Sequence, residues 1–331
     1  MNAGPDAGPD TGSTVTTLSE VVTLGETMAL MKAATPGPLA FTESLRLGIG
    51  GAESNVAIAL RRLGTSVTWV GRVGADSLGD LVLRELMAEG IDVECSRDPG
   101  APTGLMIKEH RTNETAKVWY YRSGSAGSRL APEHLPERKI AAARLLHITG
   151  ITPALSASAA EAVQSAIDCA KTAGTLVSLD LNYRSALWTK HAAAEAFRAL
   201  VRQADVVFAG DDEAAIVVGE AADPLELARR LAELGPGQAV IKLGALGCVA
   251  LVDGQEYRQD AVPVRAVDTV GAGDAFVGGY LAELLDGQPV RQRLLTAVRT
   301  GAYACLVSGD WEGMPRRSEL ELLDAAEPVS R

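Results

Sequence analysis

The chain has 331 residues, of which 47% are hydrophobic and 22% charged, and its 31 basic and 42 acidic residues give a net charge of −11. A chain of this length can bury a large core, as one large α/β domain or two smaller ones. The acidic balance argues against nucleic acids and anionic membrane surfaces as partners, and no apolar run approaches the roughly 20 residues of a membrane-spanning helix.

The composition of residues 1–19 predicts a tail that has no hydrophobic core. Residues 1–19 contain AGPD twice in succession, followed by small polar residues, and they lack the basic and apolar regions of a signal peptide. Such a composition cannot bury enough apolar surface to fold, so we expect a disordered tail. No linker interrupts residues 20–331, which are therefore predicted to form a single domain.

The cysteines and histidines do not indicate a metal site. The four cysteines form no CxxC pair, and the four histidines show no HExxH spacing. Reduced, mostly buried thiols are typical of a cytoplasmic protein, which is the location we expect.

After the tail, short apolar runs alternate with amphipathic segments in chain order. Strands are predicted at residues 21–25, 66–70, 145–148, 175–180, 205–209, 239–243 and 248–252. Helices are predicted at residues 53–63, 78–88, 158–172, 191–203, 224–234, 275–285 and 290–307. This order is typical of an α/β fold, in which helices cover both faces of a mostly parallel sheet.

Two segments break the alternation and predict a small second sheet. Residues 39–47 and 104–121 are β-like, and the HRTNET string around Asn113 is typical of a hairpin turn. Strands without intervening helices favour a small antiparallel sheet appended to the main one. The pattern leaves open whether this sheet is a lid over a site or an edge hairpin without a role.

The string DTVGAGDAF at residues 268–276 is the strongest functional motif. A strand-like run at 261–267 leads into it and a helix leaves it, so the amides of Gly271, Ala272 and Gly273 should point outward, unpaired, at a helix N-terminus. Such a turn binds anions, and Asp274 beside it can accept a proton from an attacking hydroxyl. The alternative is that Asp274 only caps the helix. Within that helix, the pair Gly278 and Gly279 predicts close packing against a neighbour.

A second glycine-rich string, GIGGAESN at residues 48–55, opens the first long helix. It does not match the dinucleotide-binding pattern GxGxxG, and the chain contains no GxxxxGK[ST]. Its adjacent glycines suit the close approach of a polar ligand, or they form a plain turn. The remaining candidates are weaker by themselves: KLGALG (242–247), DLNYR (180–184), YYR (120–122) and Asp310, for which a surface acid is the default interpretation.

Together these strings resemble the PfkB/ribokinase family of sugar kinases over residues 21 to about 323. GGAESN, GRVGADSLG at 71–79 and DTVGAGDAF carry the resemblance. It implies a ribokinase-like three-layer fold with a small β-sheet lid, here about 33–50 and 103–124, that often forms a dimer contact. It also implies transfer of the γ-phosphoryl group of ATP, with Mg²⁺, to a sugar hydroxyl, and it leaves a requirement for a monovalent cation open.

Within the family, the sequence is most similar to 2-keto-3-deoxygluconate kinases. The strings at 118–130, 147–156, 178–188 and 309–313 carry this similarity. It implies phosphorylation of the terminal 6-hydroxyl of that sugar acid. Another kinase of the family, fructokinase- or ribokinase-like, remains an alternative, as does a non-catalytic sugar- or nucleotide-binding protein of the same fold.

The resemblance assigns roles to the residues that match its motifs. Asp274 is the expected base, and the amides of Gly271, Ala272 and Gly273 form the expected anion hole. The expected sugar-binding residues are Gly51, Asn55, Tyr120, Arg122, Arg184 and Asp310. The expected ATP-binding residues are Asn182, Lys242, Gly244, Gly247, Gly271 and Gly273. Glu213 is expected to contact Mg²⁺ through water.

The sequence also departs from the family at several positions. Gly210 stands where an Asn near Mg²⁺ is usual, Val298 where close relatives often have an Asn near adenine, and Met106 where some relatives present a Tyr. Leu30 occupies a position that is acidic in many relatives acting on neutral sugars. Its apolar side chain removes one potential repulsion against a substrate carboxylate.

Overall fold

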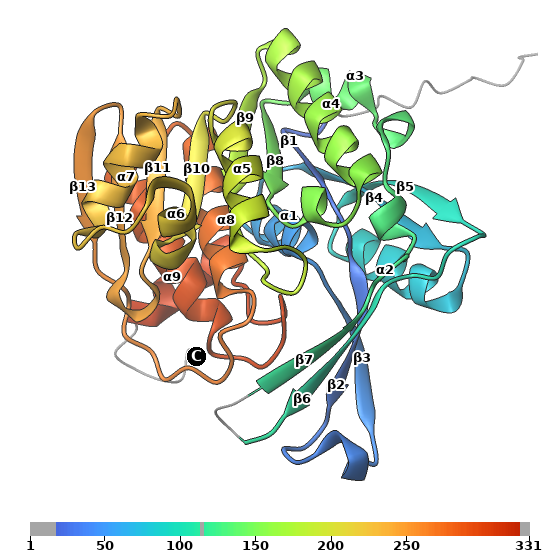
Figure 1. Ribbon diagram of the computed structural model, residues 1–331. Coiled ribbons are helices and arrows are strands. Elements are labelled where there is room, and N and C mark those ends of the chain that lie inside the picture. The colour runs from blue at the N-terminus through green and yellow to red at the C-terminus, as the bar shows by residue number, and fades with distance from the viewer. Residues whose placement is uncertain (1–17, 113–115, 325–331) are drawn as a thin grey trace, which may run out of the picture.

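A large twisted sheet crosses the centre of the computed structural model, which describes residues 18–112 and 116–324 (Figure 1). Its spatial order is β13 (Gln255–Gln259), β12 (Cys248–Val252), β11 (Gln238–Lys242), β10 (Val206–Gly210), β9 (Leu176–Asp180), β8 (Leu145–Thr149), β1 (Val21–Leu24), β4 (Val67–Gly74) and β5 (Asp92–Asp98). The strands from β5 to β11 are parallel, and β12 and β13 pair antiparallel.

Helices cover both faces of this sheet, which confirms the predicted three-layer α/β fold. One face carries α1 (Ala52–Arg62), α2 (Ser77–Ala88), α8 (Ala272–Leu285) and α9 (Val290–Ala304). The other carries α3 (Glu137–Ala142), α4 (Ala157–Ala173), α5 (Lys190–Val201), α6 (Asp211–Val218) and α7 (Pro224–Ala232). Because strand side chains alternate, Val206 and Phe208 join the first core cluster, whereas Val207 and Ala209 join the second. In the described ranges, no helix is long and apolar enough to cross a bilayer.

A small four-stranded sheet projects from the main body (Figure 1). Its order is β3 (Leu45–Gly50), β2 (Met28–Ala33), β6 (Leu105–His110) and β7 (Ala116–Tyr121). The predicted hairpin of β6 and β7 is confirmed, and its Asn113 turn lies outside the described residues. The predicted small antiparallel sheet is confirmed for the pairs β2–β3 and β6–β7, whereas β2 pairs parallel with β6. The strand predicted at 39–47 is also shifted: Leu39–Phe41 forms a 3₁₀ turn, and β3 begins at Leu45.

Several other elements differ from the sequence prediction. Strands β5 and β13 were not predicted, because they are polar edge strands without apolar alternation. The helices α3 and α6 were missed because they are short. Residues 261–267 do not form the predicted strand: Pro263 lacks an N–H, and Val267 N donates to Cys305 O after α9 instead, at 2.7 Å. Most of the predicted tail, 1–17, lies outside the described residues.

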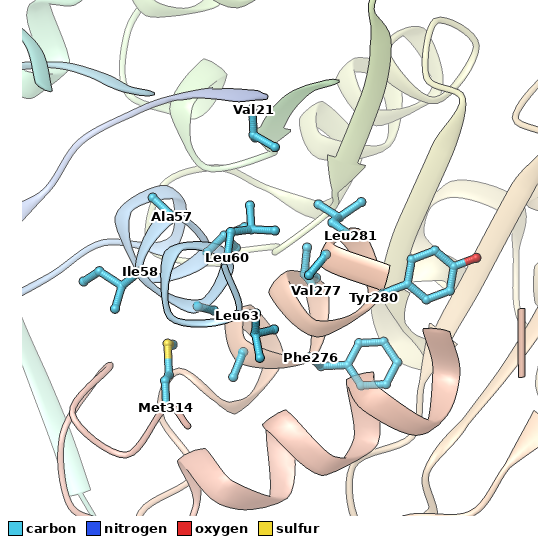
Figure 2. Packing of buried hydrophobic residues seen from close by; sticks show 14 of the residues in the cluster. Val21, Ala57, Ile58, Leu60, Leu63, Phe276, Val277, Tyr280, Leu281 and Met314 are labelled. Atoms are coloured by element: carbon cyan, nitrogen blue, oxygen red, sulfur yellow. The ribbon is translucent and has the colours of Figure 1, made fainter. Parts of the chain in front are cut away.

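The packing of α8 against α1 and α9 fixes the position of the α8 N-terminus (Figure 2). A Cβ atom at Gly278 would lie 2.5 Å from the Cβ of Ala59 on α1, and one at Gly279 would lie 3.0 Å from the Cα of Ala297 on α9. Toward the sheet, Phe276 and Tyr280 pack edge-on against Phe208. The two glycines therefore allow the close approach that the sequence predicts.

We expect Gly278→Ala to lower the free energy of unfolding by about 1–3 kcal/mol, because the added methyl group overpacks the α1 contact. In an Ala59→Gly background the same change should be neutral or stabilising, since the opposing methyl group is gone and alanine favours a helix by about 1 kcal/mol. Urea unfolding of all four proteins measures this coupling. Gly48→Ala, whose Cβ would meet nothing nearer than 4.0 Å, is the control. Equal effects in both backgrounds would contradict the packing account.

Candidate active site

A polar cavity lies where the parallel strands end and the small sheet covers them. Its volume is about 440 Å³, and Asp180, Gly210 and Lys242 line it from the carboxyl ends of β9, β10 and β11. Open α/β sheets bind ligands at this edge. A smaller cavity of about 80 Å³ continues from it, and Asp274 and Asp310 line both.

The predicted anion-binding turn forms at the start of α8. Gly271 is the N-cap residue and has a φ of 75°, a left-handed conformation that favours glycine. A Cβ at Gly271 would also collide with the carbonyl oxygen of Asp310. The N–H of Ala272 donates to Thr269 O at 3.3 Å, so the prediction of three unpaired amides is wrong at this residue. The turn still presents the positive end of the α8 dipole to the cavity.

Asp274 is buried, and two amide side chains hold its carboxylate. Nδ2 of Asn55 on α1 donates to Oδ2 at 2.8 Å, and Nδ2 of Asn182, after β9, donates to Oδ1 at 3.4 Å. Burial raises the pKa of Asp274 to about 7. Asp274 is not the N-cap of α8, because Gly271 is, so the alternative of a purely capping role is wrong. Asn182 has a φ of 41°, a conformation uncommon outside glycine.

A buried ion pair stands beside the turn. Nζ of Lys242 lies 2.6 and 2.8 Å from the two carboxylate oxygens of Asp180. Burial opposes the charge of Lys242, but Asp180 and Glu213 raise its pKa, so it stays protonated. Asp180 was not predicted as a site residue, although it begins the DLNYR string at the end of β9.

The residues near the strand ends fit a hydrated Mg²⁺ held mainly by phosphates. Glu213 and Asp212 line the cavity, but both oxygens of Glu213 accept backbone N–H groups, from Gly210 at 2.7 Å and Tyr183 at 2.9 Å. Across residues 18–112 and 116–324, no group of three or more His, Cys, Asp or Glu residues could hold a metal ion directly. Mg²⁺ typically keeps several waters and binds one or two carboxylates with substrate phosphates.

A separate, mostly apolar cavity of about 550 Å³ adjoins the turn. Lys242, Thr269 and Gly273 are shared with the polar cavity, and Val298 and Ala302 of α9 lie on the apolar side. Such a space suits a planar base. The predicted ATP-binding residues Lys242, Gly244, Gly247 and Gly273 line it. Asn182 and Gly271 do not, since they line the polar cavity.

All the residues predicted to bind sugar line the small cavity: Gly51, Asn55, Tyr120, Arg122, Arg184 and Asp310. Asp310 is buried rather than a surface acid, and burial raises its pKa to about 6. Nη2 of Arg122 lies 2.6 Å from buried Glu26. Arg184 is exposed and has no ion-pair partner in the part of the chain that the structure describes.

Several charged residues that line these cavities were not predicted from the sequence, among them Glu26, Asp180 and Lys108. Glu26 follows β1, Asp180 ends β9, and Lys108 lies in β6. The partners of Asp180 and Lys108 are 62 and 160 residues away along the chain, so no local pattern revealed these pairs. The local sequence indicated Asp180 and Lys108 only by placing a charged residue within an otherwise mostly apolar strand.

Comparison with known proteins gives consistent matches over nearly the whole chain. Residues 18–317 match the family described as pfkB family carbohydrate kinase. A 2-dehydro-3-deoxygluconokinase from Thermoproteus tenax is 37% identical over 92% of this chain and 93% of its own length. The crystal structure of a PfkB protein from Polaromonas sp. JS666 is 37% identical, with a TM-score of 0.83, over 92% of this chain and 99% of that one. That of a putative ribokinase II from E. coli in complex with ATP and Mg²⁺ is 25% identical, with a TM-score of 0.86, over 93% and 99%.

The raised pKa of Asp274 predicts how Asp274→Asn changes stability with pH. The protonated side chain stabilises the fold fully below the unfolded-state pKa near 4, and this contribution is lost as the pH rises through about 7. Relative to the parent protein, the free energy of unfolding of Asp274→Asn should therefore increase by about 3 kcal/mol between pH 5 and pH 8.

Urea unfolding at several pH values measures this difference. Asp260→Asn, which removes a negative charge from an exposed position, is the matched control. A difference between Asp274→Asn and the parent protein that stays constant from pH 5 to pH 8 would show that the carboxyl group is not held protonated by burial.

Proposed function

Because this chain belongs to the PfkB family of carbohydrate kinases, we propose that it transfers the γ-phosphoryl group of ATP to the terminal 6-hydroxyl of 2-keto-3-deoxygluconate. One observation carries the proposal: buried Asp274 lies at the junction of the two polar cavities, beside the turn of Gly271. The apolar cavity on the other side of the turn suits adenine. We also propose a cytoplasmic location, where ATP is available as the phosphoryl donor.

In the proposed reaction, Asp274 accepts the proton of the sugar hydroxyl. The hydroxyl oxygen bonds to the γ-phosphorus as the bond from that phosphorus to the β–γ bridging oxygen breaks, and ADP leaves. Asn55 and Asn182 orient the carboxylate, whose pKa of about 7 is close to that of an effective base. The α8 N-terminus, with the amide of Gly273, and Lys242 stabilise negative charge on the phosphoryl group. Mg²⁺ bound with ATP would neutralise further phosphate charge.

A sugar acid fits the charges of the small cavity better than a neutral sugar does. Arg184 is a cation without an ion-pair partner among the described residues, and Arg122 stands nearby in a geometry fixed by Glu26. Arginine binds carboxylates in a bidentate geometry. The apolar side chains of Leu30 and Met106 add no negative charge to the cavity wall. Asp310 is placed to accept a hydrogen bond from a sugar hydroxyl.

The exposed side of the small sheet supports assembly of the protein with itself. Phe41, Leu47, Trp119 and Tyr121 are 82%, 61%, 41% and 61% exposed, and all belong to the small sheet or its connecting turns. We propose that these side chains form a homo-oligomeric contact through the lid. Large exposed aromatic residues are typical of such interfaces.

The first test of the substrate is coupled ADP release with 2-keto-3-deoxygluconate, its galactonate epimer, fructose and ribose. We expect kcat/KM for the sugar acid to exceed that for either neutral sugar by roughly 100-fold or more, because a neutral sugar leaves the arginines without a counter-ion. Equal or better turnover of fructose or ribose would assign the chain to the alternative class. Binding of ATP without transfer to any sugar would indicate a non-catalytic protein.

Two variants sharpen this comparison. Arg184→Ala and Arg122→Ala should each raise KM for the sugar acid and change the residual rate with fructose little. Arg184→Ala should have the larger effect, because Arg122 already pairs with Glu26. Similar losses with both substrate classes would argue against a role of these residues in binding the carboxylate.

Asp274→Asn tests the proposed base. We expect kcat to fall by roughly 100- to 10,000-fold, while calorimetry shows nearly unchanged ATP binding, because the apolar cavity is intact. In the parent protein, kcat/KM should fall below a pH of about 7, where Asp274 becomes protonated. A near-normal rate in Asp274→Asn would remove this residue from the role of base.

A further inference from the structure

A lysine of the small sheet is buried beside the anion-binding turn. Lys108 lies in the middle of β6, and its side chain is 1% exposed. Its Nζ lies 2.5 Å from Oδ2 of Asp268 and 3.9 Å from Oδ1 of Asp310. An ammonium group withdrawn from water is unfavourable unless it is paired, so these two carboxylates hold it in place. The proposed reaction does not use this charge directly.

Asp268 in turn organises the segment that leads into Gly271. Its Oδ1 accepts the N–H of Val270 at 3.2 Å, and its Oδ2 accepts the N–H of Gly309 at 3.2 Å. Although burial acts in the opposite direction, Lys108 keeps the pKa of Asp268 below its usual range, so the carboxylate stays charged. Asp310, the second carboxylate near Lys108, packs its carbonyl oxygen directly against Gly271. A positive charge at this point therefore stabilises the turn from two sides.

We propose that Lys108 supplies the positive charge that a bound monovalent cation would otherwise supply here, so that this chain needs no such ion. A cation that supports the turn by charge would be held most strongly by a charged carboxylate close to it. Asp180 is paired with Lys242. Asp274 accepts hydrogen bonds from two side-chain amide groups and lines the reaction cavity. Asp268 and Asp310 share the ammonium of Lys108.

The carboxylates described near the turn thus do not fit a free monovalent ion. Lys108 also lines the polar cavity, and we treat it as a positioning residue that acts through Asp268. The inference rests on the proposed kinase function, but the expected binding of K⁺ to the Lys108→Met variant can be measured without any substrate.

The test compares the full-length parent protein with Lys108→Met in KCl, NH₄Cl and tetramethylammonium chloride at equal ionic strength. The parent's kcat should be the same in all three salts. In tetramethylammonium chloride, kcat of Lys108→Met should fall roughly 100-fold, the loss expected when reacting groups are misplaced by about 1 Å. K⁺ or ammonium should restore most of it in a saturable manner by occupying the vacated site. A merely structural lysine would not give this rescue.

Melting temperature gives a second readout, since an ion that binds only the folded state stabilises it. K⁺ should raise the melting temperature of Lys108→Met relative to tetramethylammonium and leave that of the parent unchanged. In Lys108→Met with Asp268→Asn, the rise should disappear. Lys32→Met is the matched control: Lys32 is a neighbouring lysine on β2 that donates to Ser308 O at 2.9 Å, and its removal should create no response to K⁺.

Two outcomes would overturn the proposal. One is a parent protein whose kcat or melting temperature depends on K⁺, a result that stands even if Lys108→Met does not fold. The other is a folded Lys108→Met that responds to neither K⁺ nor ammonium. If the parent phosphorylates none of the sugars tested, the proposed function fails, and the melting temperatures still decide the role of Lys108.

Discussion

The close contact between α1 and α8 is the constraint on which the rest of the site depends. Gly278 lets α8 approach α1 at Ala59, and one turn away the same pair of helices brings Asn55 onto Asp274. The carboxylate, the amide that orients it and the N-terminus of α8 are therefore fixed by one packing interface. The parallel strands add Asp180 and Lys242 from the opposite side, because their carboxyl ends meet at this edge.

The net charge of the chain is negative, but positively charged side chains gather beside the cavity. The chain as a whole carries −11, yet the buried carboxylates Asp180, Asp268 and Glu26 each have a lysine or arginine partner close to the cavity. Burial leaves Asp274 with a pKa near neutrality instead of a fixed charge. Negatively charged ligands would thus be recognised by a few positioned cations and a helix terminus, and long-range attraction would contribute little.

Much of the fold could be predicted from the sequence, because strands and helices with a buried face repeat their apolar residues at regular intervals. Edge strands such as β5 and β13 lack that signal, and the apolar run before Asp268 resembles a strand although Pro263 prevents pairing. In the site, the motif residues Asp274 and Asn55 could be predicted from short strings, and the structure brings them into contact. Lys108 and Asp180 could not, since each is explained only by a partner that folding brings near.

The direct passage from β1 into β2 limits how this protein can vary. Only residues 25–27 separate β1 of the main sheet from the small sheet, and Leu30 of β2 then lines the polar cavity. Because strand side chains alternate, one inserted residue in this connection would exchange the two faces of β2 and turn Leu30 away. The length of the longer turn between β2 and β3, around Leu39–Phe41, does not decide which face of β2 points toward the cavity. Length variation among natural or engineered variants should therefore be tolerated at that turn and excluded from the connection at 25–27.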